Sequence, residues 1–201
     1  MRFILLPLLA LAALPAGAQR FPARTMSVTG ADDSLATAVT VSTEYLFPPA
    51  TQGRPDIFLR AVVEKGTGAT RFFVNVQTLE HEPKRWTTLT YRGPDRAPVE
   101  MRMTEPAEEP ELVERTERTG MAGSARSATM QFRWYRERFV VEIPRATVEA
   151  WAAGRRDVRF RLASEADPDE RPEVELGAAE FPAFLRATDV AVRRHTTATP
   201  P

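Results

Sequence analysis

Two neighbouring segments of the chain limit its fold more than any other feature. Ile57–Glu64 and Thr70–Leu79 are both rich in β-branched and aromatic residues, which favour strands. The five residues between them, Lys65–Ala69, include Gly66 and Gly68. A short glycine-bearing link between two such runs is typical of a β-hairpin. The chain is therefore expected to build an antiparallel sheet around this hairpin.

Alternation of apolar and polar residues predicts further strands elsewhere. They cover Val39–Phe47, Trp86–Tyr91, Val99–Met103, Ser127–Ile143 and Val158–Leu162. In the fourth of these segments the alternation changes parity at Arg136–Arg138, which indicates either a β-bulge or two strands joined by a tight turn.

Two segments look like loops instead. Glu105–Glu117 contains two prolines, six glutamates and little periodicity, which predicts a loop or a mobile arm. Ser164–Glu173 is acidic, contains two prolines and is predicted to form a second loop. Both segments carry charges that a buried strand would not tolerate, so we expect them on the surface.

Helical periodicity appears only in the C-terminal part of the chain. After Pro144, the residues Val148, Trp151 and Ala152 fall on one face of a helix. Gly154 is placed to cap the end of this helix, because glycine readily adopts the left-handed conformation found there.

A second helix has the more apolar face, formed by Phe181, Phe184, Leu185 and Thr188. Short helices are marginal on their own, so this face must pack against the sheet. Phe184 is expected to be buried against inward-facing strand residues such as Phe160 or Val141.

These elements predict a mainly β fold: an antiparallel β-sandwich or half-open barrel of seven to nine strands with two short C-terminal helices. The chain has 201 residues, of which 43 % are hydrophobic, and this fits one globular domain. We expect a single β-rich domain over residues 25–194, after a polar lead-in over 19–24. Residues 195–201 are expected to form a disordered tail.

The first 18 residues have the features of a signal peptide. Arg2 precedes an apolar run over 3–14, and Ala16-Gly17-Ala18 provides the small residues that signal peptidase needs. We expect cleavage after Ala18 and a periplasmic or secreted protein, since the apolar run is shorter than the roughly 20 residues of a transmembrane helix. The chain has no cysteine, so it is not a lipoprotein and forms no disulfide.

The order of segments in the C-terminal half resembles that of small exported bacterial proteins with no assigned activity. A strand ends in Phe139–Pro144, a short helix runs to Gly154, the strand Val158–Leu162 follows, and Phe181–Asp189 comes last. The hairpin sequence Leu59–Gly68 is similar in character. This resemblance implies a periplasmic fold unit and assigns no functional residue.

No pattern for catalysis or metal binding stands out, so no catalytic residue, metal ligand or cofactor is predicted. The run Gly120–Ser124 has the wrong spacing for a nucleophile elbow, and neither Lys65 nor Lys84 follows a serine by three residues. The two histidines, His81 and His195, lie far apart in the sequence, and there is no cysteine to join them in a metal site.

Charge is distributed unevenly although the net charge is zero. Arg118–Ala163 has ten arginines against four acidic residues, and the acidic segments Glu100–Glu117 and Ser164–Glu180 flank it. One interpretation is that the acidic segments pair with the arginines. The other is a face for flat or anionic ligands, made of Arg133, Tyr135, Arg136 and Arg138.

Trp134 lies within that run, but its alternation with Phe132 places it in the expected core. The balanced charge argues against nucleic acid as a partner. No second segment is apolar enough to insert into a membrane once the signal peptide is removed.

The sequence thus favours a non-enzymatic exported β-domain that binds an unidentified protein or small ligand of the cell envelope. One alternative is a carbohydrate-binding module, which needs two or three exposed coplanar aromatic rings. Such rings would come from Trp86, Tyr91, Tyr135 and Trp151. Another alternative is a metal-independent hydrolase that uses paired carboxylates.

Overall fold

The computed structural model describes residues 26–43, 55–93, 97–103, 109–119, 128–164 and 169–196. Its strands are β1 (Ser27–Thr29), β2 (Ala38–Ser42), β3 (Asp56–Glu64), β4 (Thr70–Glu80), β5 (Trp86–Arg92), β6 (Pro98–Arg102), β7 (Glu111–Thr119), β8 (Ala128–Ile143), β9 (Val158–Ser164) and β10 (Glu173–Leu176). Its helices are α1 (Arg145–Gly154) and α2 (Glu180–His195). The predicted fold class is confirmed, because the fold is mainly β with antiparallel sheets, one of them a half-barrel.

The strands form two antiparallel sheets. Sheet A has six strands in the order β1-β2-β3-β4-β8-β7, and sheet B has four in the order β10-β9-β5-β6. The predicted hairpin is confirmed as β3 and β4, with Ala61 opposite Phe72. Gly66 and Gly68 in its turn have φ angles of 89° and 72°, which glycine adopts without strain.

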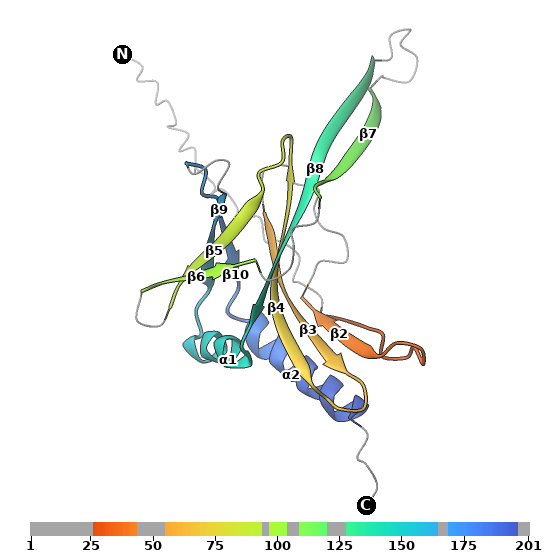
Figure 1. Cartoon of the computed structure of the whole chain (residues 1–201), viewed down its shortest axis with the longest axis vertical. Helices are drawn as coiled ribbons and strands as arrows, with labels where there is room; N and C mark the ends of the chain where they lie inside the picture. The colour runs from red at the N-terminus through yellow and green to blue at the C-terminus, as the bar shows by residue number, and fades with distance from the viewer. Residues whose placement is uncertain are drawn as a thin grey trace, which may run out of the picture.

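One hydrophobic core joins both sheets and both helices. Figure 1 shows α1 and α2 side by side at one end of the sheets, where α2 packs against β2 and β3. The largest side chains of the core are fully buried, among them Phe139, Phe160, Phe181, Phe184, Ile57, Leu59, Leu89 and Leu162. These side chains come from both sheets and from α2, so the two sheets and the helix share one core.

The predicted apolar face of the second helix is confirmed, and it is longer than expected. Phe181, Phe184, Thr188 and Ala191 are buried along α2, whereas Leu185 is only half-buried. The aromatic partner of Phe184 is Phe72 of β4, whose ring lies edge-on at 6.1 Å between centroids.

His195 belongs to α2 and not to the predicted tail. Its backbone carbonyl accepts a hydrogen bond from the N–H of Gly66, with a distance of 2.8 Å. This bond ties the end of α2 to the β3–β4 turn. Residues 197–201 and the signal segment lie outside the described residues, as does the part of the predicted strand Val39–Phe47 that follows Thr43.

The end of α1 differs from the prediction. Val148 and Trp151 are buried as expected, but the residue in the left-handed conformation is Arg155, with a φ of 50°. Gly154 is the last residue of the helix itself and has an ordinary φ. The reason is a shift of one residue in the helix end, which places an arginine where glycine would be less strained.

Ser127–Ile143 contains neither of the predicted interruptions. β8 is one continuous strand, and its registers with β4 and with β7 both run without a shift. The change of parity arises because apolar residues occupy opposite faces of one strand: Trp134 lies on one face, and Phe139 and Val141 lie on the other. The described chain does contain a register shift, but it lies in β5 between Trp86 and Thr88.

Both predicted loops contain a strand at the edge of a sheet. Part of Glu105–Glu117 forms β7, which pairs with β8 as an arm that projects from the body (Figure 1). The end of Ser164–Glu173 begins β10, which pairs with β9. Edge strands are commonly exposed and charged, as the described side chains at the start of β7 are. β10 does alternate, with Leu176 buried, but it has only four residues.

Candidate functional site

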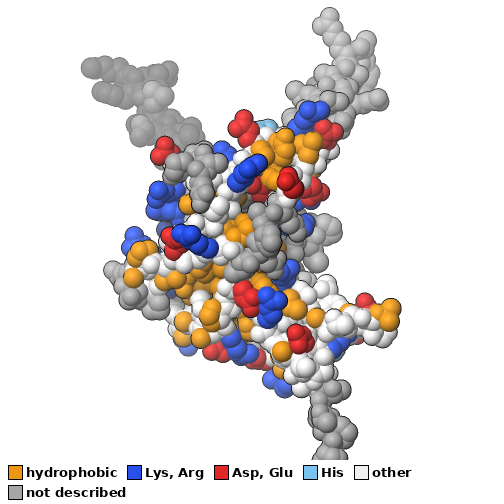
Figure 2. Space-filling view, in the orientation of Figure 1, with side chains coloured by type: hydrophobic (Ala, Val, Ile, Leu, Met, Phe, Trp, Pro, Cys, Tyr) orange, Lys and Arg blue, Asp and Glu red, His pale blue; other side chains and the backbone are white. Residues whose placement is uncertain are grey.

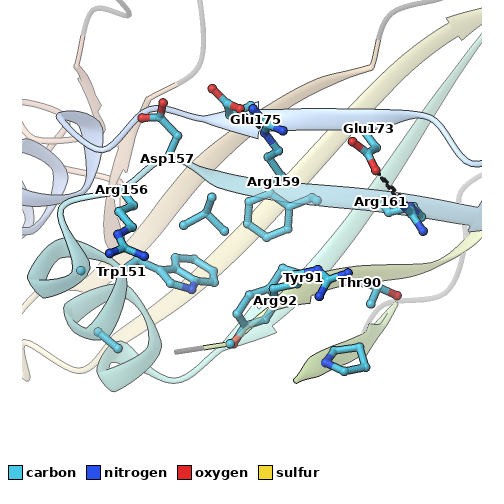
Figure 3. Close-up of a pocket in the computed structure, with 16 residues that line it drawn as sticks. Thr90, Tyr91, Arg92, Trp151, Arg156, Asp157, Arg159, Arg161, Glu173 and Glu175 are labelled. Atoms are coloured by element: carbon cyan, nitrogen blue, oxygen red, sulfur yellow. Dashed lines mark hydrogen bonds and ion pairs between the residues drawn. The ribbon is translucent and has the colours of Figure 1, made fainter. Parts of the chain in front are cut away.

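A hollow of about 980 Å³ lies where the C-terminal end of α1 meets sheet B (Figure 3). The end of β5, the start of β6, the residues that follow α1, and strands β9 and β10 all contribute to its lining. It brings side chains from α1 and from all four strands of sheet B together within the described part of the chain. We therefore take it as the candidate site.

Aromatic rings that are at most 9 % exposed form the floor of the hollow, so that little more than their edges reaches it. Tyr91 and Phe160 face each other across β5 and β9, and their ring centroids are 5.8 Å apart. Trp151 from α1 meets Tyr91 edge-on at 5.2 Å and Phe160 edge-on at 5.6 Å. Burial raises the pKa of the Tyr91 hydroxyl, and its hydrogen bond with Trp151 partly opposes that rise. The floor is thus a rigid, packed aromatic cluster.

Ion pairs on the solvent face of sheet B form part of the rim. Arg159 lies opposite Glu175 in the pairing of β9 with β10, and their side chains are 2.8 Å apart. Arg161 and Glu173 form the next pair along, at 2.6 Å. The hydrogen bond that Arg161 donates to Glu173 lowers the pKa of Glu173, and the one that Arg159 donates to Glu175 raises the pKa of Arg159.

Two more arginines line the hollow without an ion pair to any described residue. Arg92 ends β5 beside Tyr91, and Arg156 follows α1 beside Trp151 (Figure 3). The third acidic residue of the lining, Asp157, accepts a hydrogen bond of 2.8 Å from the backbone N–H of Ala178. Figure 2 shows basic and acidic side chains intermixed over sheet B, on the left of the view.

The predicted ligand face on β8 is divided between the two faces of the strand. Successive side chains of a strand alternate, so Arg133 and Tyr135 lie on one face of the sheet while Arg136 and Arg138 lie on the other. Arg133 is paired with Glu114 at 2.9 Å, and Arg136 is paired with Glu111 at 3.0 Å. The structure therefore does not bring the four residues into one surface. Instead, acidic residues of β7 and β10 pair with arginines of β8 and β9, as the first interpretation of the charge pattern predicted.

The prediction that Trp134 belongs to the core is wrong. This residue is half-buried and stacks on His81, with ring centroids 6.5 Å apart. It lies on the opposite face of β8 from Phe139 and Val141, because its position in the strand is of the other parity. The core therefore begins further along β8 than the sequence suggests.

Acidic side chains also lie close together at the β4–β5 turn. The buried carboxylate of Glu137 accepts hydrogen bonds from the backbone N–H groups of Lys84 and Arg85, at 2.6 and 2.7 Å. Lys84 also forms an ion pair of 2.6 Å with Glu170. Burial and the negative charge of Glu170 raise the pKa of Glu80. Because Glu137 is committed to backbone donors, this cluster holds the turn in place.

The aromatic residues named for a carbohydrate-binding surface do not form an exposed platform. Trp86, Tyr91 and Trp151 are each at most 9 % exposed, and Tyr135 is half-buried. Among the described residues, no group of three or more acidic or histidine side chains could hold a metal ion. Within the same residues, no helix is long and apolar enough to cross a membrane.

The sequence analysis did not identify the hollow. Arg159 and Arg161 were counted in the arginine-rich segment, but nothing marked Arg92 or Arg156 as their neighbours. The only local signal was the alternation of Arg159, Phe160 and Arg161, which places charge and aromatic surface on opposite faces of one strand. Comparison of the chain with protein-family models, curated proteins and solved structures found no match.

Proposed function

We propose that this chain is a non-enzymatic binding domain of the cell envelope, and that its hollow holds a small-molecule ligand. The observation that carries the proposal is a hollow of about 980 Å³ that has a charged rim above a packed, largely buried aromatic cluster. Binding sites for small molecules are typically concave, mostly apolar and about 300–1,000 Å³ in volume, with a few polar groups that orient the ligand.

The carboxylates of the hollow favour binding over hydrolysis. A hydrolase with paired carboxylates needs one acid with a raised pKa that can donate a proton. In the hollow, Glu173 and Glu175 are each held by an arginine, and the pKa of Glu173 is lowered. Both groups therefore suit a fixed rim of ion pairs better than proton transfer.

The test uses a residue that lines the hollow without contributing to its packing. Gly154 ends α1, and a side chain added there would meet no atom within 4 Å. Phenylnaphthylamine, a neutral dye that fluoresces in apolar surroundings, is expected to bind the wild-type protein. Gly154→Trp should weaken that binding at least about tenfold by filling the site, whereas Gly154→Ala should leave it unchanged. Equal binding by all three proteins would show that the hollow is not the site.

Export is a separate part of the proposal and rests on the signal-like residues 1–18. When the full chain is expressed in a bacterium, the protein recovered outside the cytoplasm should begin at Gln19. Intact-mass spectrometry measures this directly. A recovered chain that still carries residues 1–18 would contradict cleavage after Ala18.

A further inference from the structure

The charged groups that line the hollow leave one kind of charge unmatched. The two glutamates of β10 are engaged by arginines of β9, and the carboxylate of Asp157 is engaged by the N–H of Ala178. Arg92 and Arg156 also line the hollow and form no ion pair with a described residue, although the charge of Arg92 contributes to the lowered pKa of Glu173. The hollow thus presents cationic groups to a ligand, while its anionic groups are already occupied.

We infer that the ligand is an anion with a flat apolar part, such as an aromatic carboxylate or sulfonate, and that Arg92 and Arg156 bind its negative charge. This inference rests on the proposed function, because it requires that the hollow hold a ligand. It adds the chemical class of that ligand and the two side chains that select it.

The positions of the two arginines support this assignment. Figure 3 shows Arg156 near Trp151, at the end of α1. Arg92 follows the buried Tyr91 in β5, so its exposed side chain lies on the solvent face of sheet B. Half-buried Val158 and exposed Pro98 add apolar surface to the same lining. A guanidinium group presents several N–H donors in one plane, which suits a carboxylate or sulfonate and also stacks on flat rings.

A cationic ligand would find a less suitable site. It would have to displace Arg159 from Glu175 or Arg161 from Glu173, and both of these pairs follow the register of β9 with β10. A neutral ligand would use the apolar surface but would leave the two arginines without a role in selection. The arrangement therefore discriminates by charge as well as by shape.

The experiment compares two dyes that differ by one charged group. Anilinonaphthalene sulfonate has the ring system of phenylnaphthylamine with an added sulfonate. We expect the wild-type protein to bind the sulfonate about threefold to tenfold more tightly than the neutral dye, as one or two exposed charge pairs would provide. Added salt should reduce this difference, because it screens exposed charges.

Variants of the two arginines locate the effect. Arg92→Gln and Arg156→Gln should each weaken binding of the sulfonate about threefold to fivefold and weaken binding of the neutral dye clearly less. The matched control is Arg155→Gln, because Arg155 adjoins Arg156 but does not line the hollow. It should change neither affinity. Urea denaturation of each variant checks that the fold is retained.

The outcomes separate this inference from the proposed function. If both dyes bind equally, with sensitivity to Gly154→Trp but not to Arg92→Gln or Arg156→Gln, the hollow is a binding site and the inferred ligand class is wrong. If neither dye binds in a manner sensitive to Gly154→Trp, the proposed function fails and the inference fails with it.

Discussion

At the scale of single residues, Arg155 shows how a local conformation can lower stability. Its φ of 50° lies in the left-handed region, where a side chain crowds the backbone and glycine does not. Arg155→Gly should therefore raise the free energy of unfolding by about 0.5–1 kcal/mol. Urea denaturation measures the change. The same substitution at Arg156, whose φ is not positive, should lower stability instead; a gain at both positions would show that backbone strain is not the cause.

At the scale of elements, the docking of α2 is the contact that the sequence predicted most directly. Phe184 is fully buried and meets the ring of Phe72 in β4. Removing its ring leaves a cavity in a packed core, so Phe184→Ala should lower the free energy of unfolding by about 3–5 kcal/mol. Leu185→Ala, at the half-buried neighbouring position, should cost clearly less. A loss below about 1 kcal/mol for Phe184→Ala in urea denaturation would mean that α2 does not belong to the core.

The strands that the sequence analysis missed are β1, β7 and β10, and all three lie at sheet edges. An edge strand pairs on one side only, and its side chains are mostly exposed, as the pattern of β1 shows. The hydrophobic alternation that identifies a strand records burial of one face. β1 and β7 are therefore recognised only once their partners β2 and β8 are in place, whereas β10 alternates but is only four residues long.

At the scale of the whole molecule, Glu80 should make stability depend on pH. The pKa of Glu80 in the folded protein is raised above its usual value of 4.5. The folded protein therefore holds this proton to a higher pH than the unfolded chain does. Stability therefore falls as the pH rises through this window. Glu80→Gln removes the penalty, so it should be more stable than the wild type at pH 7, and the difference should disappear below about pH 4.

Urea denaturation at several pH values tests this expectation, and Glu142 provides the control. Its pKa is lowered by a hydrogen bond from Arg71, so its contribution has the opposite sign and is lost as the pH falls. Glu142→Gln should thus be the less stable protein at neutral pH and approach the wild type in acid. A Glu80→Gln protein that is equally or less stable than the wild type at pH 7 would contradict the assigned direction.

The sequence by itself determined the elements in which apolar residues recur with the period of a strand or a helix. The β3–β4 hairpin, the core-facing residues of β9 and the apolar face of α2 follow from spacing alone, because each buries one face in a regular repeat. Together they were sufficient to predict the antiparallel class of the fold.

Only the tertiary structure decided the candidate site. Arg92, Trp151 and Glu173 come from β5, α1 and β10, which are far apart in the chain and meet only because β9 pairs with both strands and α1 packs at their ends. Sequence patterns also could not show which arginines find an acidic partner, because pairing depends on strand register. Periodicity reports the burial of one element at a time, whereas a hollow is a property of how several elements fail to fill the space between them.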